Sequence, residues 1–207
     1  MNRCDVRAVP VDDNMAVTIK KVGVIGSGQM GHGIAQVAAL AGLDVVLNDL
    51  SDERLKSAMA TINGHLSRQV SKQALTEDAR KNALARISST GTLEGLSDCD
   101  IVIETAVEKE EVKRKIFHEL CAVLKPEAIV ATNTSSLSIT RLAAATDRPD
   151  RFIGLHCMNP VPVMQLVEVI RGHATTDATA AWTMETSRAL GKIPVEVNDY
   201  PGFVSNR

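Results

Sequence analysis

The sequence predicts an α/β fold, in which a doubly wound, mostly parallel sheet carries helices on both faces. Short apolar runs alternate with longer amphipathic stretches along the 207 residues, as expected for parallel strands joined by helices. A glycine-rich turn follows the first apolar run, a position typical of a nucleotide-binding α/β domain. The chain is 44% hydrophobic and 23% charged, which is an ordinary globular composition.

The first half of the chain predicts two buried strands and three helices. Residues 1–17 are polar and acidic and lack the apolar core of a secretion signal, so we expect a flexible tail. In the long charged stretch that follows the second strand, apolar residues recur every three or four positions, which indicates an amphipathic helix. The next expected helix begins at Thr76, and the two helices form a helical hairpin insertion. The expected strands are 20–25 and 43–48, and the expected helices are 29–41, 52–73 and 76–87.

The second half continues the alternation. Pro126 ends one helix, and Gly191 is placed to cap another at its C-terminus. The expected strands are 100–104, 129–132, 152–156, 165–170 and 193–198, and the expected helices are 109–124, 139–145 and 176–190. The residues from 201 onward begin a new element, and we expect them to start a link to a further domain.

A G-x-G-x-x-G pattern joins the first strand to the first helix. Gly26 allows the tight turn, Gly28 allows a pyrophosphate to approach the backbone, and Gly31 allows the helix to pack against the strand. Phosphate oxygens would bind the free N–H groups at the helix N-terminus. The sequence therefore predicts a Rossmann-like dinucleotide site that contains Gly26, Ser27, Gly28, Gln29, Met30 and Gly31.

Asp49 closes the second strand, about 20 residues after the glycines, where an acid binds the adenosine ribose hydroxyls. Because a carboxylate there repels the extra phosphate of NADP, we expect the cofactor to be NAD. A turn residue at the end of a strand would explain the position of Asp49 but not its register with the glycines.

His156 and Glu168 lie in two apolar runs separated by the turn Asn-Pro-Val-Pro. A buried carboxylate needs a partner, and a Glu that accepts from one ring nitrogen of a His leaves the other free as a base. The alternative is a histidine satisfied within the core. Cys157 could suggest a nucleophile, although a cysteine in an apolar strand is usually a small core residue.

Several stretches together resemble the short-chain L-3-hydroxyacyl-CoA dehydrogenase family, and most closely its bacterial 3-hydroxybutyryl-CoA dehydrogenases. The resemblance covers residues 20–207. It rests on VGVIGSGQMGHGIA, VIETAVEKEEVKRKIF, ATNTSSLSIT, RFIGLHCMNPVPVMQLVEVI and YPGFVSNR. It implies that residues 18–200 are an NAD-binding domain with a catalytic His–Glu pair, and that 201–207 start the linker to a C-terminal helical domain absent from this chain.

The resemblance also implies oxidation of a (3S)-3-hydroxyacyl-CoA to the 3-oxoacyl-CoA, with hydride passing to NAD and without a metal. His156 would be the general base, Glu168 would orient it, and Ser135 and Asn206 would complete the polar cluster. The nicotinamide side of the cofactor would be lined by Glu108, Lys113, Ser135 and Asn159. Arg68 and Lys72 would meet the phosphates of CoA.

Each of these residues also has a plainer interpretation. Ser135 could cap a helix, and Asn159 could be a turn residue. Solvated helix faces could account for Glu108 and Lys113, and for Arg68 and Lys72 on the helix 52–73. Cys157 and Met158 replace a phenylalanine pair that is frequent in the family, so the preferred acyl length stays open.

Composition limits the partners. A net charge of −2 and 2% aromatic residues argue against nucleic acid, and no apolar run is long enough for a membrane span. The four cysteines form no C-x-x-C pair and no zinc spacing, so we expect reduced thiols in a cytoplasmic protein. The resemblance implies an acyl-CoA substrate, a place in fatty acid or butanoate metabolism, and homodimerisation of full-length relatives through the missing domain. Two alternatives stay open: a dehydrogenase of a 3-hydroxy acid without CoA, and an NAD-binding module without full activity.

Overall fold

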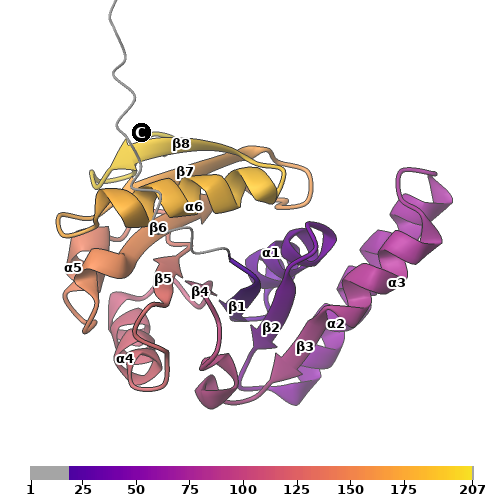
Figure 1. Cartoon of the computed structure of the whole chain (residues 1–207), viewed down its shortest axis with the longest axis horizontal. Coiled ribbons are helices and arrows are strands. Elements are labelled where there is room, and N and C mark those ends of the chain that lie inside the picture. Colours follow the sequence, from indigo (N-terminus) through magenta and orange to yellow (C-terminus); the bar gives the residue numbers. More distant parts are fainter. Residues whose placement is uncertain (1–18, 207) are drawn as a thin grey trace, which may run out of the picture.

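Eight strands form one sheet in the computed structural model, which describes residues 19–206 (Figure 1). The predicted tail at 1–17 lies outside the described residues, as does Arg207. The strands are β1 (Lys21–Ile25), β2 (Asp44–Asn48), β3 (Ile87–Thr90), β4 (Ile101–Glu104), β5 (Ile129–Thr132), β6 (Phe152–Cys157), β7 (Leu166–Arg171) and β8 (Ile193–Asn198). The α-helices are α1 (Gln29–Leu40), α2 (Asp52–Ser71), α3 (Glu77–Ala85), α4 (Glu110–Cys121), α5 (Ile139–Ala143) and α6 (Asp177–Ala189).

The strand order is β3-β2-β1-β4-β5-β6-β7-β8. Strands β1 to β6 are parallel, β7 runs antiparallel to β6, and β8 is parallel to β7. The order reverses between β1 and β4, which is where open α/β sheets bind their ligands at the carboxyl ends of the strands. The predicted doubly wound, mostly parallel sheet is confirmed.

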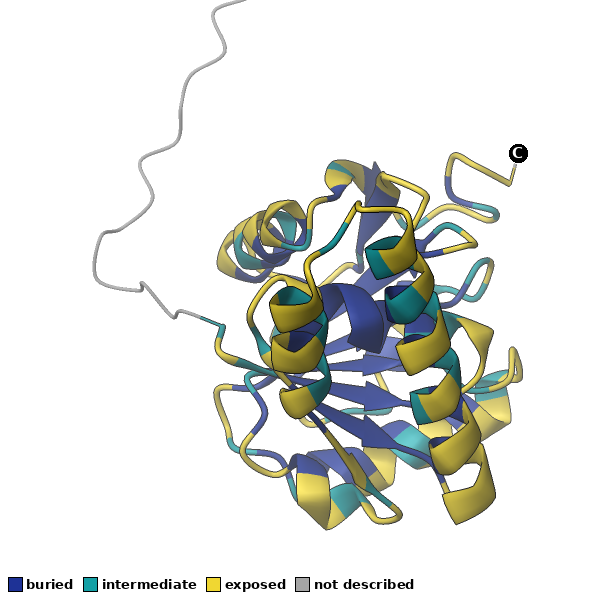
Figure 2. Ribbon diagram, turned by 90° about the vertical axis from the view of Figure 1, so that its right-hand side faces the viewer, coloured by how far each residue is buried: buried dark blue, intermediate teal, exposed yellow. Residues whose placement is uncertain are grey.

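Helices cover both faces of the sheet, and successive strand residues point to opposite layers. In β4, Ile101 and Ile103 pack with residues of α1, α2 and α6, whereas Val102 packs with residues of α4 and α5. All three are fully buried. Figure 2 shows the central strands buried between helices whose outer surfaces are exposed.

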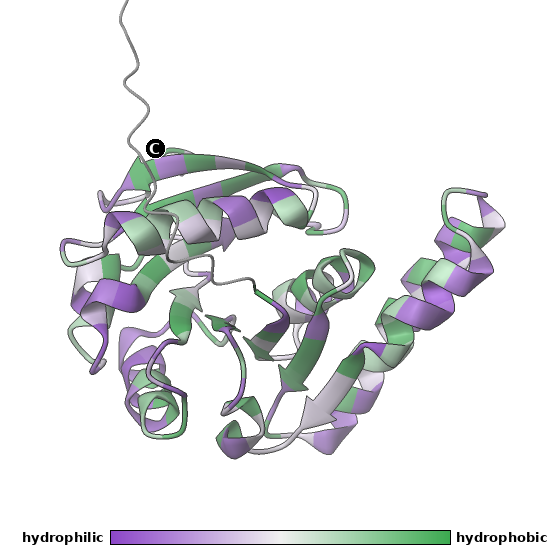
Figure 3. Ribbon diagram, in the orientation of Figure 1, coloured by the Kyte–Doolittle hydropathy of each residue, from purple (hydrophilic) through white to green (hydrophobic). Residues whose placement is uncertain are grey.

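The predicted helical hairpin is also present. Helices α2 and α3 form an arm beside the β2–β3 end of the sheet (Figure 1). The Ser51 and Thr76 side chains cap their N-termini by accepting backbone N–H bonds. Figure 3 shows polar and apolar residues alternating along this arm, which packs against the core through one face only.

One strand was missed by the sequence prediction, which continued the third helix to residue 87. The helix ends at Ala85, and β3 follows as an edge strand that pairs with β2 alone. Only Ile87 of its four residues is buried, so the strand has no apolar periodicity to detect. Within residues 19–206, no helix combines the length and apolarity needed to cross a bilayer.

Candidate active site

The glycine-rich loop joins β1 to α1 in a conformation that requires two of its three glycines. Gly26 has a positive φ of 91°. A Cβ on Gly31 would lie 1.7 Å from the Gly26 carbonyl oxygen, so no larger residue fits there. A Cβ on Gly28 would meet nothing within 4 Å, so the packing of this chain does not account for that glycine. The open approach at Gly28 and the N-terminus of α1 suit a pyrophosphate.

Asp49 lies beside this loop at the carboxyl end of β2. Its Oδ2 accepts hydrogen bonds from the Ser27 N–H at 2.9 Å and from the Ser27 hydroxyl at 2.8 Å. Burial alone would raise the pKa of Asp49, but these bonds outweigh it and hold the pKa below its ordinary value. Asp49 is therefore an ionised acceptor fixed to the loop, as binding of ribose hydroxyls requires.

His156 and Glu168 face each other across the β6–β7 pair. They are direct cross-strand partners in the antiparallel register, and His156 Nδ1 lies 2.8 Å from Glu168 Oε2. Both residues are buried, Glu168 to 2% exposure. An ionised carboxylate can only accept, so Nδ1 carries the proton and Nε2 of a neutral ring is left as the basic nitrogen. The contact expected from the sequence is present.

Glu168 is held by further donors from the segment that follows β8. Its Oε1 accepts from the backbone N–H groups of Val204 at 3.0 Å and Ser205 at 2.8 Å, and its Oε2 accepts from the Ser205 hydroxyl at 2.8 Å. Burial would raise the pKa of Glu168, but the bonds from His156, Ser205 and Val204 keep it below its ordinary value. The carboxylate therefore stays charged while buried.

The loop after β5 carries Ser135. Glu108 accepts from the Ser135 N–H at 2.9 Å and from the hydroxyl of Thr134, and Asn206 Nδ2 donates to the Ser135 carbonyl at 3.1 Å. The N-cap of α5 is Ser138, which excludes the capping interpretation of Ser135. Three predicted site residues, Ser135, Glu108 and Asn206, are thus brought together.

Lys113 does not lie on a solvated helix face, which was one interpretation of its sequence context. Its side chain is 1% exposed, and its ammonium donates to both carboxylate oxygens of Glu104, at 2.7 and 2.9 Å. The Glu108 carboxylate lies 3.6 Å away, on the Ser135 side. Lys113 thus links the end of β4 to the loop after β5.

Three of the other candidates have exposed side chains. Arg68 and Lys72 are exposed at the end of α2 on the hairpin arm, and Asn159 is exposed in the loop after β6. Cys157 is buried, and burial raises the pKa of its thiol to about 12, so a thiolate nucleophile is excluded at neutral pH.

The region of the glycine loop and the region of the His156–Glu168 pair are in contact. The loop after β6 packs on α1, because a Cβ on Gly33 would lie 3.0 Å from the Val161 Cβ. Asn133, which follows β5, accepts from the Cys157 N–H at 2.9 Å and so ties the end of β6 to the Ser135 loop. The His–Glu pair and the glycine loop therefore belong to one edge of the sheet.

Four contributing residues were missed from the sequence: Glu104, Thr105, Asn133 and Ser205. Three of them end or directly follow a strand at the carboxyl edge of the sheet: Glu104, Thr105 and Asn133. Their position at this edge was the sequence signal that could have identified them. The Thr105 hydroxyl donates to the Ile25 and Gly26 carbonyls and holds the glycine loop. Ser205 carried no comparable signal.

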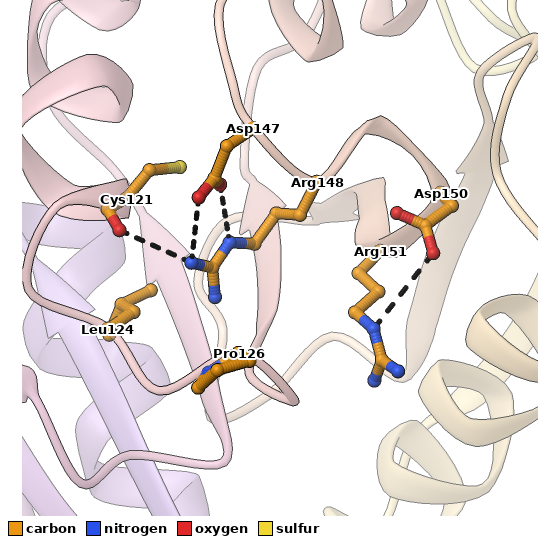
Figure 4. Close-up of a pocket in the computed structure, with 7 residues that line it drawn as sticks. All are labelled: Cys121, Leu124, Pro126, Asp147, Arg148, Asp150 and Arg151. Carbon is orange, nitrogen blue, oxygen red and sulfur yellow. Dashed lines mark hydrogen bonds and ion pairs between the residues drawn. The ribbon is translucent and has the colours of Figure 1, made fainter.

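A second concavity lies at the opposite edge of the sheet, before β5 and β6 (Figure 4). Its central group is the buried Arg148, whose guanidinium donates to the Asp147 carboxylate and to the Cys121 and Lys125 carbonyls. Because this charge is already satisfied by the chain, we interpret the concavity as a structural junction. Its lining residues are Cys121, Leu124, Pro126, Asp147, Arg148, Asp150 and Arg151.

Comparison with known proteins agrees with this geometry. The chain is 69% identical over 193 residues to a 3-hydroxybutyryl-CoA dehydrogenase from Bradyrhizobium diazoefficiens, covering 93% of this chain and 66% of the relative. It superimposes on the crystal structure of (S)-3-hydroxybutyryl-CoA dehydrogenase PaaH1 from Ralstonia eutropha with a TM-score of 0.90 and 48% identity, covering 92% and 67% of the two chains. A diketoreductase structure matches with a TM-score of 0.86 and 30% identity, covering 91% and 68%.

The chain thus spans about two thirds of the length of these relatives. Residues 21–200 match the model of the 3-hydroxyacyl-CoA dehydrogenase NAD binding domain. The chain therefore belongs to the 3-hydroxyacyl-CoA dehydrogenase family, of which it carries the domain that binds NAD.

Proposed function

We propose that this protein catalyses NAD-dependent oxidation of a (3S)-3-hydroxyacyl-CoA, namely 3-hydroxybutyryl-CoA, to the 3-oxoacyl-CoA. The observation that carries the proposal is the buried His156–Glu168 pair at the switch-point edge, with Nδ1 bound and Nε2 left basic. The identity to 3-hydroxybutyryl-CoA dehydrogenases supports the substrate class.

The residues divide the chemistry between them. His156 Nε2 takes the proton of the substrate hydroxyl, and Glu168 stabilises the imidazolium that results. Ser135 holds the reacting oxygen or the thioester region, and Asn206 holds the Ser135 loop through its carbonyl. When bound, NAD supplies the acceptor for the hydride.

The cofactor is held by the same edge of the sheet. Gly28 admits the pyrophosphate, Asp49 accepts from the adenosine ribose, and Glu108, Lys113 and Asn159 line the nicotinamide side. Arg68 and Lys72 on the hairpin arm would meet CoA phosphates. This arrangement needs no metal, because the base handles only a proton.

A second candidate is a dehydrogenase that acts on a 3-hydroxy acid or ketone without CoA. The observation that favours it is the likeness to a diketoreductase, whose described activity concerns dicarbonyl compounds. The higher identity to the 3-hydroxybutyryl-CoA enzymes favours the first candidate.

The deciding experiment measures NADH oxidation with acetoacetyl-CoA and with free acetoacetate, while NADH binding is recorded in the same sample. We expect rapid oxidation that depends on the CoA moiety. Equal turnover of free acetoacetate would establish the second candidate. NADH binding without oxidation of either substrate would make the chain a cofactor-binding module whose catalytic cleft is incomplete.

A further inference from the structure

The segment that follows β8 is fastened to the sheet at two points before it reaches the active site. The Asp199 carboxylate accepts from the N–H groups of Ile139 and Thr140 and from the Ser138 hydroxyl, at the start of α5. Phe203 is fully buried, and its ring centroid lies 6.1 Å from that of His156. Phe203 has a φ of 52°, a conformation that residues with a Cβ seldom adopt. The segment therefore has a defined path beside His156.

This path delivers three donors to Glu168. The Val204 and Ser205 N–H groups bind Oε1, and the Ser205 hydroxyl binds Oε2, the same oxygen that faces His156 Nδ1. A glutamate side chain has three rotatable bonds, and the last of them has no sharp preference. The β6–β7 register alone brings the two side chains together but does not fix the plane of the carboxylate. Donors on both oxygens do fix it.

We propose that Ser205 is a positioning residue for the His156–Glu168 pair, acting through Glu168 without touching a reacting atom. The two backbone donors stay whatever the side chain at position 205 is, whereas the bond to Oε2 depends on its hydroxyl. The proposal rests on the proposed function in assigning His156 as the base, but the hydrogen-bond geometry can be measured without turnover.

The experiment compares Ser205→Ala and Ser205→Thr with the unchanged 207-residue chain. Ser88→Ala is the matched control, because the Ser88 hydroxyl donates to the Val45 carbonyl at the far edge of the sheet. The first readout is the NMR signal of the His156 Nδ1–H proton, assigned by its loss in His156→Gln. We expect Ser205→Ala to speed exchange of this proton with water, and Ser205→Thr and Ser88→Ala to leave it as in the unchanged chain.

The second readout is steady-state reduction of acetoacetyl-CoA. We expect Ser205→Ala to lower kcat by roughly tenfold, the loss of one hydrogen bond to a charged group, with the KM for NADH unchanged. Ser205→Thr should restore kcat. A fall in kcat with an unchanged KM for NADH would separate positioning of the base from a general effect on folding or on cofactor binding.

Three results would overturn the proposal. One is an Nδ1–H proton that exchanges equally in the unchanged chain and in Ser205→Ala. Another is an equal loss in the Ala and Thr variants, which would point to packing instead of the hydroxyl. The third is the absence of this proton signal in the unchanged chain. If the unchanged chain binds NADH but does not reduce acetoacetyl-CoA, the proposed function fails and the proton measurement decides the role of Ser205 by itself.

Discussion

Two buried glutamates, Glu104 in β4 and Glu168 in β7, differ in the kind of basic side chain that they bind. Glu104 is 0% exposed and binds the ammonium of Lys113, whereas Glu168 is 2% exposed and binds the imidazole of His156. A lysine paired with a carboxylate keeps its charge at neutral pH, whereas histidine is the side chain that gains and loses a proton there. Burial of a carboxylate alone therefore does not define a catalytic group. Its partner decides whether it can only stabilise the fold or can also support the proton transfer proposed for His156.

The two glutamates also differ in where their remaining donors come from. Glu104 accepts from the hydroxyl of Thr132, its partner in the neighbouring strand β5, and from the Ala106 N–H two residues along the chain. Glu168 depends on Val204 and Ser205, which are 36 and 37 positions away along the chain. The Glu104–Lys113 pair is therefore held within β4, β5 and α4, whereas the Glu168–His156 pair depends on a segment that follows the last strand of the sheet.

The largest effect should come from His156→Gln, which removes the titratable partner and keeps the volume of the side chain. We expect kcat to fall by about 10²–10⁴-fold, the usual contribution of a general base, with NADH affinity kept. Stopped-flow kinetics and NADH titration measure the two quantities. His118→Gln, at an exposed position in the last turn of α4, is the control and should leave kcat unchanged. A loss below about tenfold would refute the role of His156.

A smaller but still large effect on stability is expected when the ion pair of Glu104 and Lys113 is broken. Lys113→Met leaves the Glu104 carboxylate buried without a counter-charge, and should lower the free energy of unfolding by about 3–5 kcal/mol. Urea denaturation measures this. Lys115→Met is the control on the same helix, because Lys115 is exposed and lies 3.9 Å from Glu119, and it should change stability by less than about 0.5 kcal/mol.

The double variant Glu104→Gln with Lys113→Met should recover much of that loss, since it removes both charges. If Lys113→Met changes stability as little as the Lys115→Met control, the charge of Lys113 is not what stabilises the buried Glu104 carboxylate.

The smallest effect is a pH dependence of stability carried by Glu168. Because its pKa in the folded state lies below the ordinary value of 4.5, ionised Glu168 stabilises the fold above that pH, and the stabilisation is lost as the pH falls through the folded-state pKa. The gap in unfolding free energy between the unchanged chain and Glu168→Gln should therefore be largest near neutral pH and narrow in acid. Urea titrations at several pH values measure the gap.

Glu196→Gln provides the matched control for that titration. Glu196 lies on the outer strand β8, is half-exposed, and contacts Arg171 at 3.4 Å. The difference in unfolding free energy between the unchanged chain and Glu196→Gln should be small at every pH. A gap for Glu168→Gln that does not vary with pH would contradict the linkage.

Much of the fold was predictable because its physical signals are local. Apolar runs bounded by turns identified seven of the eight strands, and the glycine loop was identified because Gly26 and Gly31 are required by backbone geometry within a single turn. The His156–Glu168 contact was predictable for a related reason. A carboxylate within an apolar strand needs a partner, and a short turn leaves few candidates.

The parts that were missed depend on distant contacts. β3 is an edge strand with one buried residue, so its pairing with β2 and not its own pattern makes it a strand. Lys113 occurs in a run of charged residues, and only its contact with Glu104 shows that it is buried. Ser205 is a small polar residue whose role depends on the path of the chain after β8. Such roles have no local periodicity.

The antiparallel hairpin of β6 and β7 also sets a condition on the loop that connects its strands. Side chains alternate between the faces of a sheet, so a shift of β7 by a single position would turn Glu168 away from His156 toward the layer of α6. The loop between the two strands must therefore hold β7 in this register. An insertion or deletion that shifted this register by one residue would therefore separate His156 from Glu168 without changing either side chain.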